Sequence, residues 1–127
     1  MRLILVRHAE AANGRPDALR PLTDTGRRAA AKLGRRLAEE APDAVVSSPL
    51  VRARETAAAI AGAAGIEAEE DARLAPGATA EGVRALVAER GGTVVAVGHQ
   101  PDCSEIVLEL DGREVTFPPA GFAVVEL

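Results

Sequence analysis

Short apolar runs alternate along the chain with longer stretches of mixed polarity. Residues 3–6, 44–46, 93–97 and 123–125 are apolar almost without interruption, which is typical of strands buried on both faces. The stretches between them favour helices over residues 24–41, 49–61, 79–90 and 101–110. Strands that alternate with helices predict an α/β fold, a three-layer α/β/α sandwich around a mostly parallel sheet.

Residues that start or stop helices bound these stretches. Thr23 or Asp24 can cap the first helix, and Pro42 stops it. Pro49 suits the first turn of the second helix, and Gly62 lies past its expected end. Residues 62–77 form the loosest region, with one edge strand expected near residues 66–69. No linker or repeat divides the 127 residues, so we expect one domain over residues 1–127.

Polar residues directly follow three of the expected strands. The first strand leads into Arg7 and His8, the second into two serines, and the third into Gly98 and His99. Ligands of open α/β sheets bind beyond the carboxyl ends of the strands. His8 and His99 are the only histidines of the chain, and both stand at such an end. We therefore expect them to share one site.

The side chains at these strand ends suit a phosphoryl group. If the ends are neighbours, Arg7, His8, His99 and Arg52 converge, with Arg20 and Arg54 as further candidates. Guanidinium groups bind phosphate oxygens through two parallel hydrogen bonds and keep their charge. A neutral imidazole among them can attack phosphorus and form phosphohistidine, which water then hydrolyses.

Composition and charge exclude several other functions. A net charge of −4 and only two aromatic residues argue against nucleic acid or an anionic membrane as a partner. Cys103 is the only cysteine, and Glu109 stands where a cysteine phosphatase needs an arginine, so we expect Cys103 to be a buried apolar residue. The apolar run at the N-terminus is too short for a signal peptide, so a cytoplasmic location is expected.

Four segments then form a recognisable set. They are residues 5–9 (LVRHA), 20–26 (RPLTDTG), 47–56 (SSPLVRARET) and 97–101 (VGHQP). The set covers nearly the whole chain and resembles the histidine phosphatase superfamily, whose fold is phosphoglycerate-mutase-like. Within it, the chain looks like the short phosphohistidine phosphatases of the SixA type.

The resemblance implies a role for each matching residue. It makes His8 the phosphorylated nucleophile and His99 the second catalytic histidine, while Arg7 and Arg52 bind phosphate. Arg20 matches an arginine that lines the pocket in SixA-like members.

Structural roles are the leading interpretation for other residues of the motifs. Thr56 supports Arg52, Gly26 allows close packing at the start of a helix, and Ser47 and Ser48 shape the rim of the pocket. Ala9 stands where the family usually has glycine, which alanine can replace unless that position needs a positive φ.

The chain lacks the general acid of the ester-cleaving family members. Gln100 follows the second histidine where some of those members have aspartate. Glu81, Asp102 and Glu10 remain as candidate acids, although a solvated surface carboxylate is the leading interpretation of each. Residues 57–93 are also too few for the lid that mutases insert.

An open site without an acid favours protein phosphohistidine as substrate, because an imidazole leaving group can carry its own proton. A small phosphomonoester or an acyl phosphate is the alternative.

Two further classes of protein compete with this hypothesis. A metal hydrolase could use His8, His99 and Asp102, but nearby arginines would repel a cation, so we expect neither a metal nor another cofactor. A phosphate-binding domain with little turnover would keep the same arginines and histidines. The sequence does not fix the oligomeric state, and a monomer is compatible with it.

Overall fold

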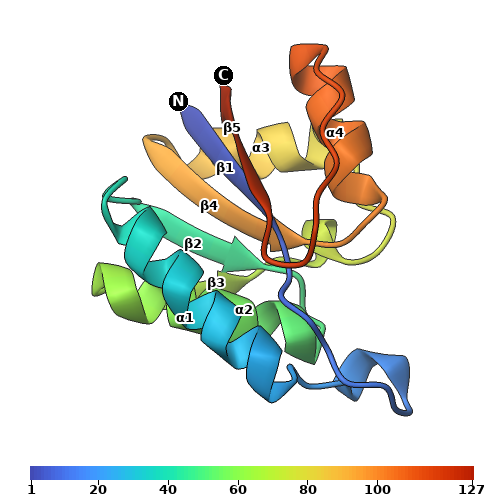
Figure 1. Cartoon of the computed structure of the whole chain (residues 1–127). Coiled ribbons are helices and arrows are strands. Elements are labelled where there is room, and N and C mark those ends of the chain that lie inside the picture. Colours follow the sequence, from blue (N-terminus) through green and yellow to red (C-terminus); the bar gives the residue numbers. More distant parts are fainter.

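Five strands form a single sheet in the order β3-β2-β4-β1-β5 (Figure 1). The computed structural model describes all 127 residues. The strands are β1 (Arg2–Arg7), β2 (Ala44–Ser47), β3 (Ala68–Glu70), β4 (Thr93–Gly98) and β5 (Phe122–Glu126). All neighbouring pairs are parallel except β1 with β5, which is antiparallel. The predicted mostly parallel sheet is therefore confirmed.

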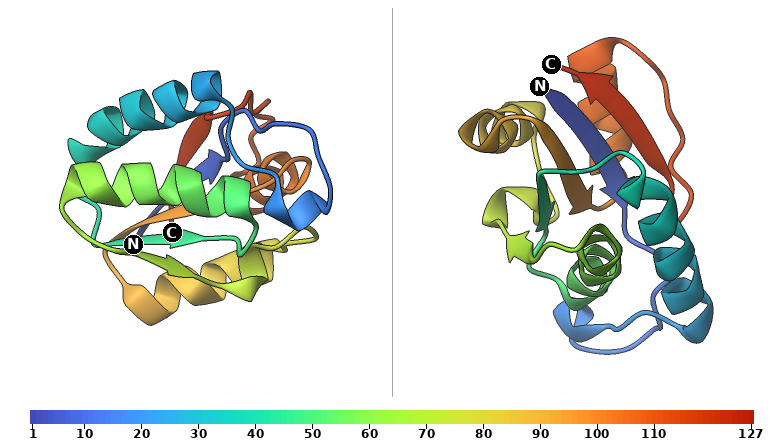
Figure 2. Two further views of the ribbon diagram at one scale, coloured as in Figure 1. Left: turned by 90° about the horizontal axis from the view of Figure 1, so that it is seen from below. Right: turned by 90° about the vertical axis from the view of Figure 1, so that its left-hand side faces the viewer.

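Four α-helices cover the two faces of the sheet (Figure 2). They are α1 (Asp24–Ala38), α2 (Val51–Ala64), α3 (Ala80–Arg90) and α4 (Asp102–Asp111). Two short 3₁₀ helices, η1 (Asp17–Leu19) and η2 (Ala72–Leu74), lie in the connections.

Alternate residues of the central strands supply two separate cores. Ile4 and Val6 of β1 pack with α1 and α2, whereas Leu3 and Leu5 pack with α3 and α4. Because successive side chains of a strand point to opposite faces, a continuous apolar run is buried on both sides. This arrangement is the predicted three-layer sandwich.

Two helix ends differ from the prediction. Helix α2 continues past Gly62 to Ala64, because Gly65 takes the left-handed conformation with φ of 75° and closes the last turn. A side chain at Gly62 would meet open space, so that glycine does not stop the helix. Helix α1 begins after Thr23, whose hydroxyl accepts a hydrogen bond from the Gly26 N–H, and ends at Ala38, short of the predicted end.

A closed loop projects between β1 and α1. We call residues 12–21, which include η1, the η1 loop; backbone bonds join its two ends, with Ala12 N–H donating to Pro21 O at 2.8 Å. A Cβ at Gly26 would lie 2.0 Å from the carbonyl oxygen of Glu10, so only glycine permits this approach. The loop therefore leaves the body of the protein at a fixed place.

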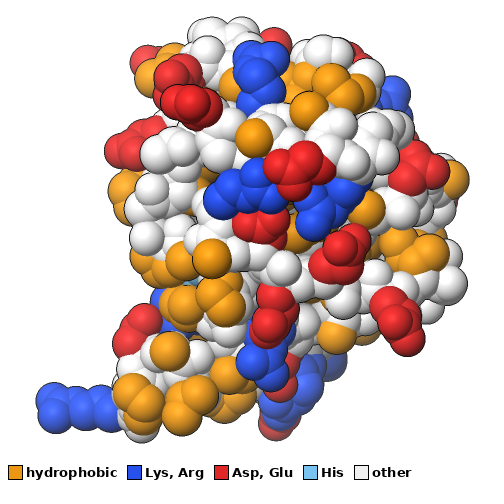
Figure 3. All heavy atoms as spheres, turned by 180° about the vertical axis from the view of Figure 1, so that it is seen from behind, with side chains coloured by type: hydrophobic (Ala, Val, Ile, Leu, Met, Phe, Trp, Pro, Cys, Tyr) orange, Lys and Arg blue, Asp and Glu red, His pale blue; other side chains and the backbone are white.

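Charged side chains of both signs are interleaved on the face shown in Figure 3. Ion pairs of the protein surface include those of Arg73 with Asp71 at 2.7 Å and with Glu89 at 2.7 Å. This face has no extended basic patch. No helix has the length and apolar character required to cross a membrane.

Candidate active site

The polar ends of β1, β2 and β4 lie side by side because β4 is between the other two strands. Arg7 is opposite Gly98 in the register. Beyond the strands the pairing continues, since the N–H of His8 donates to Gly98 O at 3.1 Å and that of Ser48 donates to Val97 O at 3.0 Å. The ring centroids of His8 and His99 are 5.3 Å apart. The structure thus brings the two histidines together.

His8 is held in the form that a nucleophile needs. Its Nδ1 lies 2.7 Å from the carbonyl oxygen of Ala9, and because a carbonyl only accepts, Nδ1 carries the proton. Burial lowers the pKa of His8; the bond to Ala9 opposes this effect, and the charges of Arg52 and Arg7 lower the pKa further. The neutral ring therefore has its lone pair on Nε2.

His99 is buried and neutral, and a serine orients it. Burial lowers the pKa of His99 to about 4, with smaller effects from His8 and Arg52. Its Nε2 lies 2.7 Å from Ser48 Oγ. The Leu50 N–H donates to the same oxygen at 3.2 Å, which leaves the hydroxyl proton free to point at Nε2. In that arrangement the proton of His99 is on Nδ1, which is buried without a partner.

Sequence reasoning missed this contact of Ser48, because a serine after a strand has no signature that separates a turn residue from a partner of histidine.

Arg7 and Arg52 approach the histidines from different elements. Arg7, at the end of β1, donates from Nη1 to Phe117 O at 2.9 Å, while its Nε is buried with no partner. Arg52, in the first turn of α2, is 7% exposed. The charges of both arginines act on the ring of His8.

The η1 loop adds Arg20 and a carboxylate that the sequence did not single out. Asp17 Oδ2 lies 3.2 Å from Arg52 Nη2, and Asp17 Oδ1 lies 2.8 Å from Arg20 Nη1. The backbone oxygen of Asp17 accepts from Arg52 Nη1 at 2.9 Å. Arg20 also donates from Nε to Ala12 O at 2.8 Å. Asp17 thus joins two of the predicted phosphate ligands.

Thr56 links the first strand end to the helix that carries Arg52. Its hydroxyl accepts from the buried N–H of Ala9 at 3.1 Å and donates to Arg52 O at 2.8 Å. Ala9 is absent from the residues with positive φ, so alanine causes no strain in place of the usual glycine. Thr56 has the supporting contacts expected of it.

The comparisons with known proteins agree with this geometry. The family model of the histidine phosphatase superfamily (branch 1) matches residues 3–76, more than half of the chain. The chain belongs to this superfamily. No curated protein sequence matches it.

Solved structures of similar fold extend over nearly the whole chain. The protein histidine phosphatase SixA in complex with tungstate has a TM-score of 0.88 and 26% identity, over 100% of this chain and 88% of that one. A protein from Agrobacterium tumefaciens, provisionally assigned as the phosphohistidine phosphatase SixA, has a TM-score of 0.83 and 29% identity, over 97% and 89% of the chains. One from Nakamurella multipartitia with the same provisional assignment has a TM-score of 0.74 and 33% identity, over 97% and 82%.

Family membership and these matches make the chain a phosphatase with the phosphoglycerate-mutase-like fold.

None of the candidate general acids forms a side-chain hydrogen bond or ion pair with a histidine of this phosphatase. Asp102 accepts hydrogen bonds from the N–H groups of Gly77 and Ala78, at 2.8 and 3.3 Å. Glu10 accepts from the Thr23 hydroxyl at 2.7 Å, and Glu81 is exposed in the first turn of α3. The carboxylate whose charge acts on His99 is that of Asp17.

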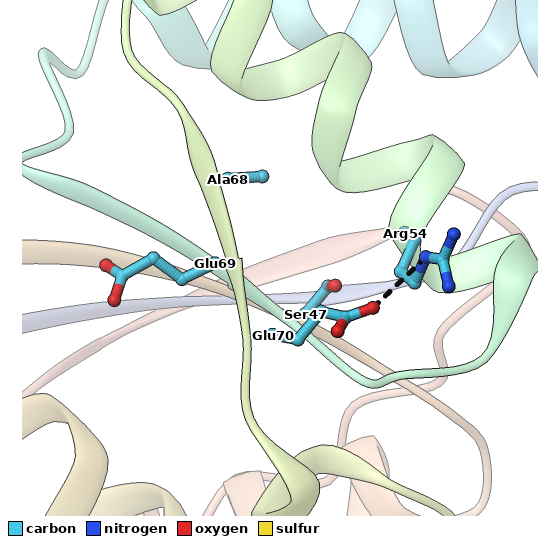
Figure 4. Close-up of a pocket in the computed structure, with 5 residues that line it drawn as sticks. All are labelled: Ser47, Arg54, Ala68, Glu69 and Glu70. Carbon is cyan, nitrogen blue, oxygen red and sulfur yellow. Dashed lines mark ion pairs between the residues drawn. The ribbon is translucent and has the colours of Figure 1, made fainter.

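Arg54 lies two residues after Arg52 in α2 and has a different environment. Its Nε pairs with Glu70 Oε1 at 3.1 Å (Figure 4). The pair borders the largest hollow of the surface, about 580 Å³, between α2 and β3. Neither histidine lines this hollow. Arg54, a further candidate for the site from the sequence, is thus a surface residue.

Cys103 is buried, as predicted, and its backbone N–H donates to His99 O at 2.9 Å. Burial raises the pKa of its thiol to about 12. Its Sγ lies 3.8 Å from Val6 O, behind the end of β1.

Proposed function

We propose that the protein hydrolyses phosphohistidine on other proteins, with His8 as the nucleophile. The state of His8 is the observation that carries this proposal. Its Nδ1 keeps the proton and donates it in a hydrogen bond to Ala9 O, so the lone pair of Nε2 is available beside three arginines. A neutral imidazole in that position attacks phosphorus in line and expels the leaving group.

The remaining groups bind the phosphoryl oxygens in this proposal. Arg7 Nε and His99 Nδ1 are buried polar atoms without a partner, which is unfavourable unless a ligand pairs with them. A phosphoryl oxygen is an acceptor for both. Arg52 and Arg20 add positive charge from the side of the η1 loop. SixA was solved with tungstate, a tetrahedral oxyanion, which supports an oxyanion site in this fold.

The surroundings of the site favour a protein as the substrate. No surface hollow is lined by His8 or His99, and the segment between α2 and β4 holds only β3, η2 and α3. Leu19, at the end of η1, exposes 62% of its surface, as an apolar contact for another protein would. A small phosphomonoester or acyl phosphate is the second candidate substrate. A phosphate-binding domain with little turnover is the third possibility.

We further propose that the histidine phosphatase domain spans residues 1–127, since the matches to solved structures cover 97% to 100% of the chain. A cytoplasmic location and the lack of a cofactor stay predictions from the sequence.

Labelling with an alkaline quench tests the function. The protein is mixed with a phosphohistidine peptide, quenched with alkali, and analysed for alkali-stable, acid-labile phosphate on His8. We expect this adduct, release of inorganic phosphate, and faster turnover of the peptide than of an alkyl phosphate. Failure to form the adduct or release phosphate would support a binding domain, and a preference for the alkyl phosphate would support a metabolite phosphatase.

A further inference from the structure

The carboxylate of Asp17 lies where the site should hold only positive charge. It forms hydrogen bonds with Arg52 and Arg20, and its side chain is 64% exposed. These hydrogen bonds lower the pKa of Asp17, so the carboxylate remains ionised at neutral pH. It therefore places a negative charge beside the proposed position of the phosphoryl group.

A negative charge at this place disfavours a phosphate dianion. Like charges repel, and the repulsion is stronger in a partly buried site than in water. A neutral side chain could align the arginines and would oppose the binding of phosphate less than a carboxylate does. The Asp17 backbone oxygen also already accepts from Arg52 at 2.9 Å. The charge thus needs an explanation other than alignment.

The side of the site on which Asp17 lies supplies that explanation. His8 directly follows β1 and is half-buried, whereas η1 has no buried residue. In-line attack by His8 places the leaving group on the far side of phosphorus, toward solvent. The exposed carboxylate of Asp17 belongs to that outer side, next to the leaving group.

We propose that Asp17 is a specificity-determining residue, which selects phosphoryl groups whose leaving group is a protonated imidazole. The proposal rests on the proposed function and refines it. A phosphohistidine ring that carries a proton on its second nitrogen presents a cationic N–H to Asp17. An alkyl or aryl phosphate ester has no such group and meets only the repulsion.

The reaction step needs no proton from Asp17. Nε2 of His8 forms a bond to phosphorus while the bond from phosphorus to the substrate imidazole breaks. The electron pair of that bond goes to the leaving nitrogen and cancels the positive charge of the ring. The imidazole departs neutral, with its proton still on the second nitrogen, and the carboxylate stays ionised. Water then hydrolyses phosphorylated His8 and releases inorganic phosphate.

The test is Asp17→Asn, which keeps the shape of the side chain and removes its charge. We expect kcat/KM for a phosphohistidine peptide to fall about tenfold, because the leaving ring loses an ionic hydrogen bond. For p-nitrophenyl phosphate, kcat/KM should rise about threefold as the repulsion disappears. The alkaline limb of the peptide's pH–rate profile should also move to lower pH, because less of the bound ring stays protonated.

Asp24→Asn is the matched control. Asp24 is an exposed carboxylate that pairs with an arginine three residues further along α1, away from the histidines. Both rates should stay within about twofold of the wild type for this change.

A parallel fall of both substrates in Asp17→Asn, with an unmoved pH profile, would reduce Asp17 to a positioning residue and overturn the proposal. Unchanged rates would overturn it as well. Failure of the proposed function has a different result, since the wild type would then form no adduct on His8 with the peptide.

Discussion

Two regions meet at the active site, and they are built in opposite ways. The strand-end floor, residues 7–8, 47–48 and 98–99, continues the buried sheet and is fixed by backbone bonds such as His8 N–H to Gly98 O. The η1 loop has no buried residue in its helix, and its Asp17 bonds to Arg52 of α2 and to Arg20 of the loop itself. In our proposal the floor holds the groups of the reaction, and the loop holds groups that meet the substrate. The proposal therefore assigns reaction and selectivity to separate parts of the chain.

The largest expected effect is that of His8→Ala, which removes the nucleophile from the floor. Turnover of a phosphohistidine peptide should fall at least about 10³-fold, because the variant lacks the imidazole that we propose forms the covalent intermediate. The phosphate release assay measures it, with circular dichroism to show that the variant folds. Substantial remaining turnover would mean that the floor does not carry the reaction as we describe it.

Acid should lower the free energy of unfolding through the buried His99 of the floor. An unfolded histidine binds a proton near pH 6.5, whereas the pKa of His99 in the folded protein is about 4. Between these values the unfolded state binds more protons, so the free energy of unfolding decreases as pH falls. The expected loss from His99 is about 3 kcal/mol, roughly a hundredfold in the folding equilibrium.

Urea unfolding between neutral pH and pH 4 measures this loss. His99→Gln has no ring to titrate, so its stability should depend less on pH over the same range. Identical pH dependence of the two proteins would mean that His99 is accessible to protons in the folded state.

Arg52→Lys tests the residue that connects floor and loop. Lysine keeps the charge but loses the two parallel donors. The transition state should lose about 2 kcal/mol of stabilisation, which lowers kcat/KM close to thirtyfold. Arg54→Lys on the same helix, whose arginine pairs with Glu70 on the surface, should stay within about twofold. Equal losses in the two variants would show that charge on α2, not the position of Arg52, matters.

Ser48→Ala has the smallest expected effect and tests whether the Ser48 hydroxyl orients the ring of His99. Without the hydroxyl, His99 Nε2 loses the partner that fixes the Nδ1 proton, and kcat should fall about tenfold. Ser47→Ala, which removes a hydroxyl bonded to Ser48 O, should change kcat less than about threefold. If the two variants are equally active, Ser48 does not orient His99.

The floor could be predicted from the sequence because two signals coincide there. Continuous apolar runs identify buried strands, and polar residues such as Arg7, His8 and His99 are conspicuous directly after them. Parallel pairing then brings the ends together. The family motifs pointed to Arg52 in the same way.

The loop could not be predicted in this way. Asp17 lies in a short polar stretch with no periodicity, and its contact with Arg52 joins residues 35 positions apart. Ser48 was predicted only to shape the rim of the pocket, since the partner of its hydroxyl, His99, follows another strand. Helix α2 continues past Gly62 because a glycine ends a helix only where the backbone needs a positive φ. That position is Gly65.

The bonded ends of the η1 loop have a consequence for how such a protein can change. The bond from Ala12 N–H to Pro21 O and the close approach of Gly26 to Glu10 close the loop at its base, so its attachment there is made by residues outside η1. Closing a longer loop costs little, about 0.6 kcal/mol for each doubling of length. Insertions and replacements within residues 12–21 can therefore accumulate while His8 and His99 keep their geometry. The loop is an exchangeable module, through which one catalytic floor can be adapted to new substrates.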